Sequence, residues 1–196
     1  MSTVRKHEFI SIDDYLSGEL VAHDKHEYVA GLVYAMVGGT NVHNSIASRV
    51  LIQLGSQLKG KRCQALNSDS KIRIRQSHHT RFYYPDVSVV CRPNPQQDTF
   101  HDEPVVVVEV LSRGTRRIDE GEKREAYLSI PSLTTYILLE QDSAAATVYR
   151  RSENGFEQQV YSGLSETIAV PEIQAQLSLS AVYEGIEFIP EPAEEP

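Results

Sequence analysis

The sequence has few of the residues that mark specialised classes of protein. Its 196 residues include no tryptophan and only two cysteines, Cys63 and Cys91, which form no CxxC pair. Two such cysteines make neither a disulfide framework nor a zinc ribbon, so we expect plain, buried or half-buried thiols. No apolar run could span a membrane, and residues 1–9 lack the apolar core of a secretory signal. We therefore expect a cytoplasmic protein with no membrane partner.

Several catalytic motifs are absent as well. The sequence has no GxSxG motif, no HExxH motif and no glycine-rich phosphate loop, so acyl-transfer enzymes and zinc proteases have no support. An excess of basic residues is also lacking, since the formal net charge is −8. Proteins that coat nucleic acids nonspecifically use lysine and arginine to neutralise phosphates, so this charge argues against that class.

Length and composition fit one domain with a sizeable core. The chain is 40% hydrophobic, which is ordinary for a globular protein. We predict a single domain over residues 1–185. Residues 186–196 contain four glutamates, three prolines and no basic residue, a composition that predicts a disordered tail. Because this tail carries much of the negative charge, the body is only mildly acidic, and binding of nucleic acid is not excluded.

The most informative stretch lies between Tyr84 and Tyr127. Within it, the apolar run at residues 105–111 indicates a strand buried on both faces, yet Glu109 interrupts the run. A buried carboxylate must be paired, protonated or bound to a cation. Asp86 opens the preceding apolar strand, directly after Pro85. If the two strands are neighbours in the sheet, both carboxylates can lie near one end of it, which is the outline of a metal site.

A lysine follows on the next expected helix. A helix over Asp119–Ile130 would place Lys123 on the same face as Ala126 and Tyr127, at 100° per residue. That face is apolar, so Lys123 is expected to point inward. A purely structural role is the alternative: Asp119 and Lys123 stand four residues apart and can pair, while Glu109 could pair with an arginine.

In this order, these residues resemble the motif of the PD-(D/E)XK nuclease superfamily. The sequence around them resembles its Uma-two-type, restriction-endonuclease-like branch. The resemblance runs from about Ile12 to about Tyr183 and includes EYVAGLVYAM, YPDVSVV, PVVVVEVLS and IPSLTTYILLE. It implies an α/β fold with a restriction-endonuclease-like core, in which helices flank a central mixed β-sheet. It also implies a metal-dependent endonuclease that hydrolyses phosphodiester bonds in DNA.

The resemblance implies a role for each residue of the candidate site. Asp86 and Glu109 would hold Mg²⁺, which Mn²⁺ could replace, and the backbone carbonyl of Val110 would add a ligand. Lys123 would orient the attacking water or stabilise the transition state. The chain departs from the superfamily pattern at Leu111, where the lysine normally stands. Relocation of this lysine to the next helix is a known variation, and Lys123 is the natural substitute.

One further metal candidate, Glu27, and three secondary candidates come from other segments. Glu27 corresponds to a family acid near the active site that helps to hold the metal, although it could equally be a solvated strand residue. His43 lies along the buried stripe of a helix expected over residues 40–59, where a core role competes with a role at the site, since the family also has a histidine there. Arg113 and Arg116 belong to a basic turn just beyond the second acidic strand, and could reach a scissile phosphate.

The remaining segments follow simple patterns. Lys71–Arg75 alternates basic and apolar residues, so its basic face is either the wet side of a strand or a surface that meets phosphates. We interpret His101 and Asp102 as loop surface. The other expected elements are a helix at 11–17 stopped by Gly18, strands that turn at 30–31, a strand at 133–140, a hairpin at 145–161 and a strand with a short helix at 164–183.

A second function remains open on the sequence. A catalytically inactive nuclease-fold protein could act as a DNA-binding or protein-interaction module, and both Leu111 and the acidic charge favour that alternative. A different metal-dependent hydrolase on an α/β fold has less support. We expect a homodimer, because two DNA strands need two cuts.

Overall fold

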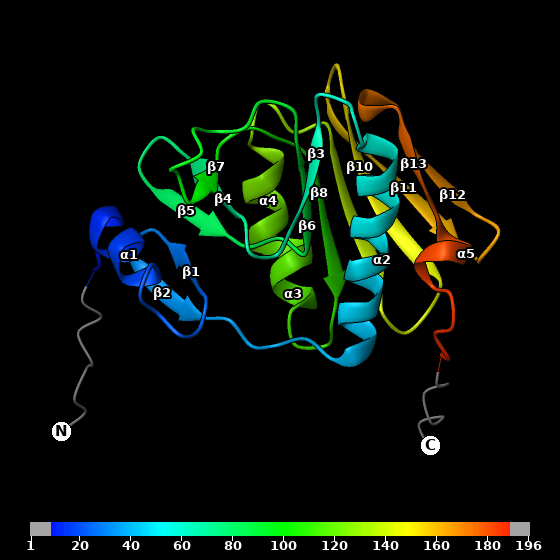
Figure 1. Ribbon diagram of the computed structural model, residues 1–196, viewed down its shortest axis with the longest axis horizontal. Helices are drawn as coiled ribbons and strands as arrows, with labels where there is room; N and C mark the ends of the chain where they lie inside the picture. The colour runs from blue at the N-terminus through cyan, green and yellow to red at the C-terminus, as the bar shows by residue number, and fades with distance from the viewer. Residues whose placement is uncertain (1–8, 189–196) are drawn as a thin grey trace.

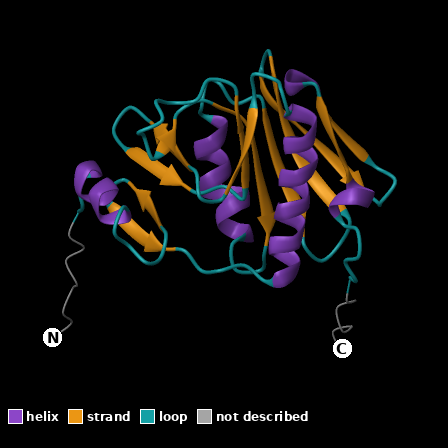
Figure 2. Ribbon diagram, viewed as in Figure 1, coloured by secondary structure: helices purple, strands orange, loops and turns teal. Residues whose placement is uncertain are grey.

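A six-stranded mixed sheet forms the centre of the molecule in the computed structural model, which describes residues 9–188 (Figure 1). The strand order is β11-β10-β9-β8-β6-β3. Strands β8 and β9 are parallel and their neighbours pair antiparallel. The strands are β3 (Gln64–Asn67), β6 (Val87–Val90), β8 (Pro104–Leu111), β9 (Thr135–Glu140), β10 (Ala145–Ser152) and β11 (Gly155–Ser162). The mixed sheet flanked by helices confirms the predicted α/β fold (Figure 2).

A smaller five-stranded sheet has the order β2-β1-β5-β4-β7. Its strands are β1 (His26–Val29), β2 (Leu32–Ala35), β4 (Lys71–Arg75), β5 (Thr80–Tyr83) and β7 (Phe100–His101). The first two form the predicted hairpin. It turns at Ala30 and Gly31, where φ is 51° and 98°, as a two-residue turn between twisted antiparallel strands requires.

One face of the central sheet is covered by α2 (Asn41–Leu58), α5 (Leu179–Val182) and a hairpin of β12 (Thr167–Val170) and β13 (Ala175–Ser178), joined by the 3₁₀ turn η2 (Pro171–Ile173). The predicted stripe of α2 is buried against β8. Thr40 caps this helix, because its side-chain oxygen accepts a hydrogen bond from the His43 amide at 3.2 Å. This cap fixes the first turn of α2 beside the end of the sheet.

The opposite face carries one helical segment and packs against the five-stranded sheet. The segment comprises α3 (Arg116–Ile118), the π-helical turn η1 (Asp119–Lys123) and α4 (Arg124–Leu128). The prediction of a helix over Asp119–Ile130 was therefore wrong in its bounds. Its inward face was predicted correctly, since Lys123 and Tyr127 are buried. Single π-helical turns widen the helix locally and are frequent at functional sites.

The outer face of the five-stranded sheet is covered by α1 (Ile12–Glu19). Tyr15 of this helix packs against Tyr28 and Phe82, with ring centroids 5.0 and 5.3 Å apart. The side chain of Ser11 caps the helix by accepting a hydrogen bond from the Asp14 amide. The helix was expected to stop at Gly18, but it continues for one more residue, to Glu19.

Three predictions about individual side chains are wrong. Cys63 and Cys91 form a disulfide rather than two thiols, because the pairing of β3 with β6 brings these flanking residues together. Asp102 is not merely loop surface, since its carboxylate accepts two hydrogen bonds of 2.7 Å from Arg73. Lys71 does not lie on a wet strand face but is buried beneath α1.

The last described residues pack near α5. Ile186 and Phe188, the first apolar residues of the predicted tail, pack partly against the core, and the rings of Phe188 and Tyr183 are 5.5 Å apart. The rest of that tail, residues 189–196, lies outside the described residues, as do residues 1–8. Within residues 9–188, none of the helices combines the length and the apolar character that crossing a membrane requires.

Candidate metal and catalytic centre

The candidate centre lies where the start of β6 meets β8. Alternate side chains of β8 face opposite sides of the sheet: Val108 and Val110 face α2, whereas Leu111 faces the side of α4. Glu109 shares the α4 side, because strand side chains alternate. Asp86 stands one residue before Val87, which pairs with Val108. The structure therefore brings Asp86 and Glu109 together, as the sequence suggested.

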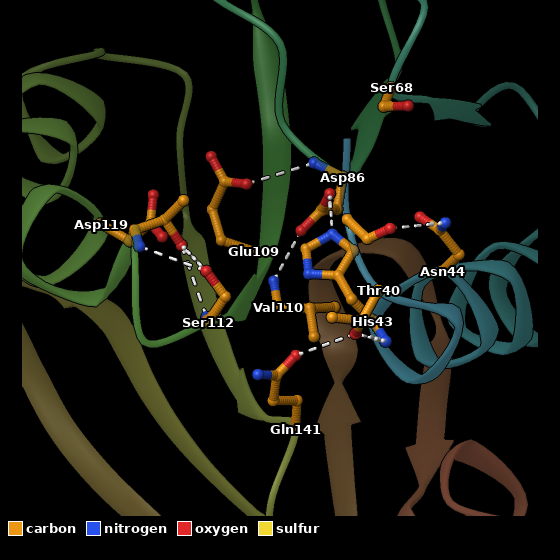
Figure 3. Close-up of polar contacts among 12 residues, drawn as sticks. Thr40, His43, Asn44, Ser68, Asp86, Glu109, Val110, Ser112, Asp119 and Gln141 are labelled. Atoms are coloured by element: carbon orange, nitrogen blue, oxygen red, sulfur yellow. Dashed lines mark hydrogen bonds and ion pairs between the residues drawn. The ribbon is translucent and has the colours of Figure 1, made fainter. Parts of the chain in front are cut away.

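The two acids hold each other through backbone amides (Figure 3). The amide of Asp86 donates to Glu109 Oε2 at 3.2 Å, and the amide of Val110 donates to Asp86 Oδ2 at 2.7 Å. Each carboxylate is thus fixed by the strand that carries the other. These hydrogen bonds restrict the orientation of both carboxylates.

His43 joins this pair from the first turn of α2. Its Nε2 lies 2.9 Å from Asp86 Oδ1 (Figure 3), so the histidine contacts the candidate site and not only the core. Burial lowers the pKa of His43, but the hydrogen bond and the charge of Asp86 outweigh this and raise the pKa above its ordinary value. Its Nδ1 is buried without a hydrogen-bond partner in the described part of the chain.

Lys123 enters from the π-helical turn and is only 7% exposed. Its Nζ lies 2.8 Å from Glu27 Oε1, 3.6 Å from Glu109 Oε1 and 3.6 Å from Asp119 Oδ1. It also lies over the ring of Tyr83, 5.4 Å from the centroid. Both interpretations of Lys123 are thus represented: it pairs with Asp119 within its own helix, and it reaches Glu109 and Glu27.

The electrostatics show that this cluster is short of positive charge. Burial, followed by the charges of Asp119, Asp86 and Glu27, raises the pKa of Glu109 well above its ordinary value, and Lys123 only partly opposes this. Burial also raises the pKa of Asp119. Burial lowers the pKa of Lys123, yet the surrounding carboxylates raise it overall. Raised pKa values of both the acids and the lysine arise when several buried carboxylates share one cation.

Two residues of the cluster were not predicted as parts of the site. Tyr127 donates a hydrogen bond of 3.3 Å to Glu109 Oε1, and Asp119 was considered only as a helix partner of Lys123. A signal for both was present, because Asp119, Lys123 and Tyr127 are spaced by four residues on the face that points inward. The sequence did not show that this face would meet Glu109.

One of the secondary candidates differs from expectation. Arg116 is the first residue of α3 rather than part of a flexible turn, and it contacts Glu140 through both guanidinium nitrogens and Glu120 at 3.1 Å. Its charge is therefore already paired. Arg113 is exposed in the loop after β8. Val110 lies in the ladder between β8 and β9, opposite Leu139.

The side chains present fit a hard divalent cation in their chemistry. Three carboxylates, those of Glu27, Glu109 and Asp119, surround one lysine, and the carboxylate of Asp86 acts on Glu109 beside them. Mg²⁺ prefers oxygen ligands of this kind. Among residues 9–188, no group of three or more histidine, cysteine, aspartate or glutamate side chains is arranged so that it could hold a metal ion. The excess negative charge is what a bound cation would neutralise.

Comparison with protein families gives one match over most of the chain. Residues 12–182 match the model of the Uma2 family, which is described as "Putative restriction endonuclease". The matched span contains every residue of the centre described above.

Individual relatives agree with the family match. The chain is 33% identical to the uncharacterized protein slr1290 of Synechocystis sp. over 180 residues, which cover 91% of this chain and 94% of that protein. A second uncharacterized Synechocystis protein, sll1609, is 26% identical over 144 residues, or 72% and 80% of the two chains. A crystal structure from Anabaena variabilis, titled "a putative nuclease belonging to DUF820", has a TM-score of 0.70 at 18% identity and covers 89% of this chain and 97% of that one.

Proposed function

We propose that this chain, which belongs to the Uma2 family of restriction-endonuclease-like proteins, is a metal-dependent endonuclease that hydrolyses phosphodiester bonds in DNA. Membership of the family supports a nuclease-like function. The metal, the reaction and the residues that perform it are our proposal. The observation that carries it is the convergence of Asp86, Glu109 and Lys123 at one end of the central sheet.

The carboxylates are the proposed metal ligands. Asp86 and Glu109 would hold Mg²⁺, or Mn²⁺ in its place, with Glu27 and the carbonyl of Val110 as further ligands. When bound, such a cation lowers the pKa of a coordinated water and neutralises charge that develops on phosphoryl oxygens. The strand amides that hold both acids preorganise their oxygens, so little reorganisation is needed for binding.

Lys123 supplies the cation that the superfamily usually places two residues after the acid. Leu111 occupies that position and is 1% exposed in the core, so an amine there would have to displace packed side chains. Lys123 reaches Glu109 from the same side of the sheet, and its Nζ lies 3.6 Å from Oε1. We assign to Lys123 the stabilisation of negative charge on the phosphoryl oxygens.

His43 is proposed as a positioning residue. It contacts Asp86 Oδ1 while the Val110 amide contacts Oδ2, so the carboxylate is held from two sides. These two contacts restrict rotation of the Asp86 carboxylate and fix its plane relative to Glu109.

The substrate and the setting remain predictions. DNA is the proposed substrate. A homodimer and a cytoplasmic location, both expected from the sequence, are proposed as well. The alternative is an inactive nuclease-fold protein that binds DNA or another protein, and the lack of a group of three side chains arranged to hold a metal ion among residues 9–188 is the observation that favours it.

A plasmid-nicking assay separates the two functions. Supercoiled plasmid is incubated with the full chain and Mg²⁺ or Mn²⁺, with and without a chelator, beside Asp86→Asn purified identically. The proposal predicts nicking by the wild type that both the chelator and the substitution abolish. Equal nicking by wild type and Asp86→Asn, or none by either with both metals, would support the inactive alternative.

A further inference from the structure

A second buried lysine lies outside the candidate centre. Lys71 opens β4 and is 5% exposed. Its Nζ lies over the rings of Tyr84 and Tyr15, 5.3 and 5.9 Å from their centroids. Within residues 9–188, the ammonium has no hydrogen bond and no ion pair with any acid. The amine of a lysine with so little exposure usually has a carboxylate partner, and this one has none among those residues.

The nearby charges do not compensate this burial. Glu19 is the acid that acts on Lys71, but its carboxylate already accepts hydrogen bonds from Tyr84 and from His26. Burial lowers the pKa of Lys71 below its ordinary value, and the charge of Glu19 only partly opposes this. The amine therefore keeps a free lone pair at a lower pH than an exposed lysine does.

The amine has space in front of it. Lys71 lines an open pocket of about 480 Å³ together with Tyr84, Phe100 and His101, a size within the range of small-molecule sites. Four acidic side chains line the same pocket, against two lysines and two histidines: Glu19, Asp24, Asp69 and Asp98. Because Asp69 already pairs with Lys25, the remaining acids disfavour a strongly anionic ligand and favour a neutral one.

We propose that Lys71 is the amine nucleophile of a second site, which takes a small neutral aldehyde as an imine. The amine of this nearly covered side chain has no hydrogen-bonding partner in the described part of the chain, lies over two aromatic rings and faces an accessible pocket. Lysines placed in poorly hydrated surroundings are the ones that form Schiff bases with carbonyl compounds.

The reaction needs no further reactant. The lone pair of Lys71 Nζ attacks the carbonyl carbon, and the π electrons of the C=O bond move to oxygen. A proton passes from nitrogen to oxygen to give the carbinolamine. Water then leaves as the C=N bond forms, so amine and aldehyde yield imine and water without oxidation or reduction.

This site is separate from the candidate nuclease centre. Tyr83 and Tyr84 are consecutive, and they place their rings against Lys123 and Lys71 respectively. Consecutive residues of an extended chain point to opposite faces. Lys71 thus lies on the α1 side of the five-stranded sheet, whereas Lys123 lies on the side that faces β8. The proposal does not depend on nuclease activity.

Reductive trapping tests the proposal on the full chain. Pyridoxal and sodium cyanoborohydride are added at about pH 7, labelling is kept low, and peptides are mapped by mass spectrometry. We expect the peptide that contains Lys71 to be labelled before those that contain the exposed residues Lys59 and Lys61. The preference should vanish in urea, where all lysines are equivalent. Labelling of Lys71 no faster than that of Lys59 would overturn the proposal.

Three variants complete the test. Lys71→Met should lose the early label, and the control variant Lys61→Met should keep it, because Lys61 is exposed and does not line the pocket. Asp86→Asn, designed to lack nuclease activity, should be labelled as the wild type is. Loss of nicking with retained labelling would separate failure of one proposal from failure of the other. The comparison of lysines within the wild type remains decisive even if Lys71→Met does not fold.

Discussion

Lys123 and Lys71 are both buried, both lie over tyrosine rings, and yet have opposite surroundings. Three carboxylates lie within 3.6 Å of Lys123 Nζ, whereas Lys71 has two rings and, in the part of the chain that the structure describes, no ion pair. The carboxylates raise the pKa of Lys123, and burial lowers that of Lys71. The partners, rather than burial alone, decide whether a buried amine acts as a fixed cation or as a nucleophile.

The difference also has a cause in the strands that carry the partners. Tyr83 and Tyr84 divide the two sites between the faces of one sheet. Glu109 and Glu27 meet Lys123 because β8 and β1 approach the π-helical turn from two sides. On the other face, α1 contributes mainly aromatic contacts. The two amines are thus chemically distinct because they lie on opposite faces of the five-stranded sheet.

The largest effect is expected for Lys123→Met. This change leaves Glu27, Glu109 and Asp119 buried without their cation, so the free energy of unfolding should fall by about 3–5 kcal/mol. Urea unfolding measures it, with Lys71→Met as the matched removal of a buried amine. If Lys123→Met were as stable as the wild type, the ion pairs would not be what holds the cluster together.

The next effect is expected for Glu27→Gln. This substitution removes a ligand candidate and one partner of Lys123 but keeps the size of the side chain, so plasmid nicking should fall by about 10–100-fold. Folding should be preserved, because a repelling carboxylate leaves the cluster. The rate of nicking at saturating Mg²⁺ measures the loss, and circular dichroism checks the fold. An unchanged rate would place Glu27 outside the centre.

A smaller effect is expected for Lys71→Met. No carboxylate loses a partner, and the methionine keeps most of the apolar stem, so only the contacts of the ammonium with Tyr84 and Tyr15 are lost. The free energy of unfolding should change by about 1 kcal/mol or less. Urea unfolding beside Lys123→Met provides the measurement. A loss as large as that of Lys123→Met would erase the contrast between the two sites.

The smallest effect is a difference in pH dependence. Between the lowered folded pKa of Lys71 and the ordinary lysine value of about 10.4, the folded state binds fewer protons than the unfolded chain. Stability therefore rises with pH across that window in the wild type. Lys71→Met has no titrating amine at this position. The free energy of unfolding of the wild type relative to that of Lys71→Met should therefore increase as the pH rises toward about 10. Parallel unfolding curves at every pH would contradict the lowered pKa.

The acids of the centre could be predicted from the sequence because they break a strong pattern. Glu109 interrupts an otherwise apolar strand, and Asp86 opens its neighbour, so burial and proximity followed from the rules of sheets. The inward face of Lys123 followed from helical spacing. The π-helical turn did not, because a shift of one hydrogen-bond register leaves no mark in a short sequence.

Other features depend on contacts between distant segments. Lys71 alternates with apolar residues and was expected on a wet face, but α1 covers that face from more than fifty positions earlier in the chain. Cys63 and Cys91 form a disulfide because β3 pairs with β6. Tyr127 was recognised as buried, while its hydrogen bond to Glu109 depends on how α4 lies against β8.

Calorimetric titration with Mg²⁺ tests the central claim most directly, namely that the carboxylates around Lys123, unlike the surroundings of Lys71, form a cation site. The wild type and Lys71→Met should bind Mg²⁺ alike, whereas Glu109→Gln should show no binding. Equal binding by Glu109→Gln and the wild type, or no binding by the wild type, would contradict the claim.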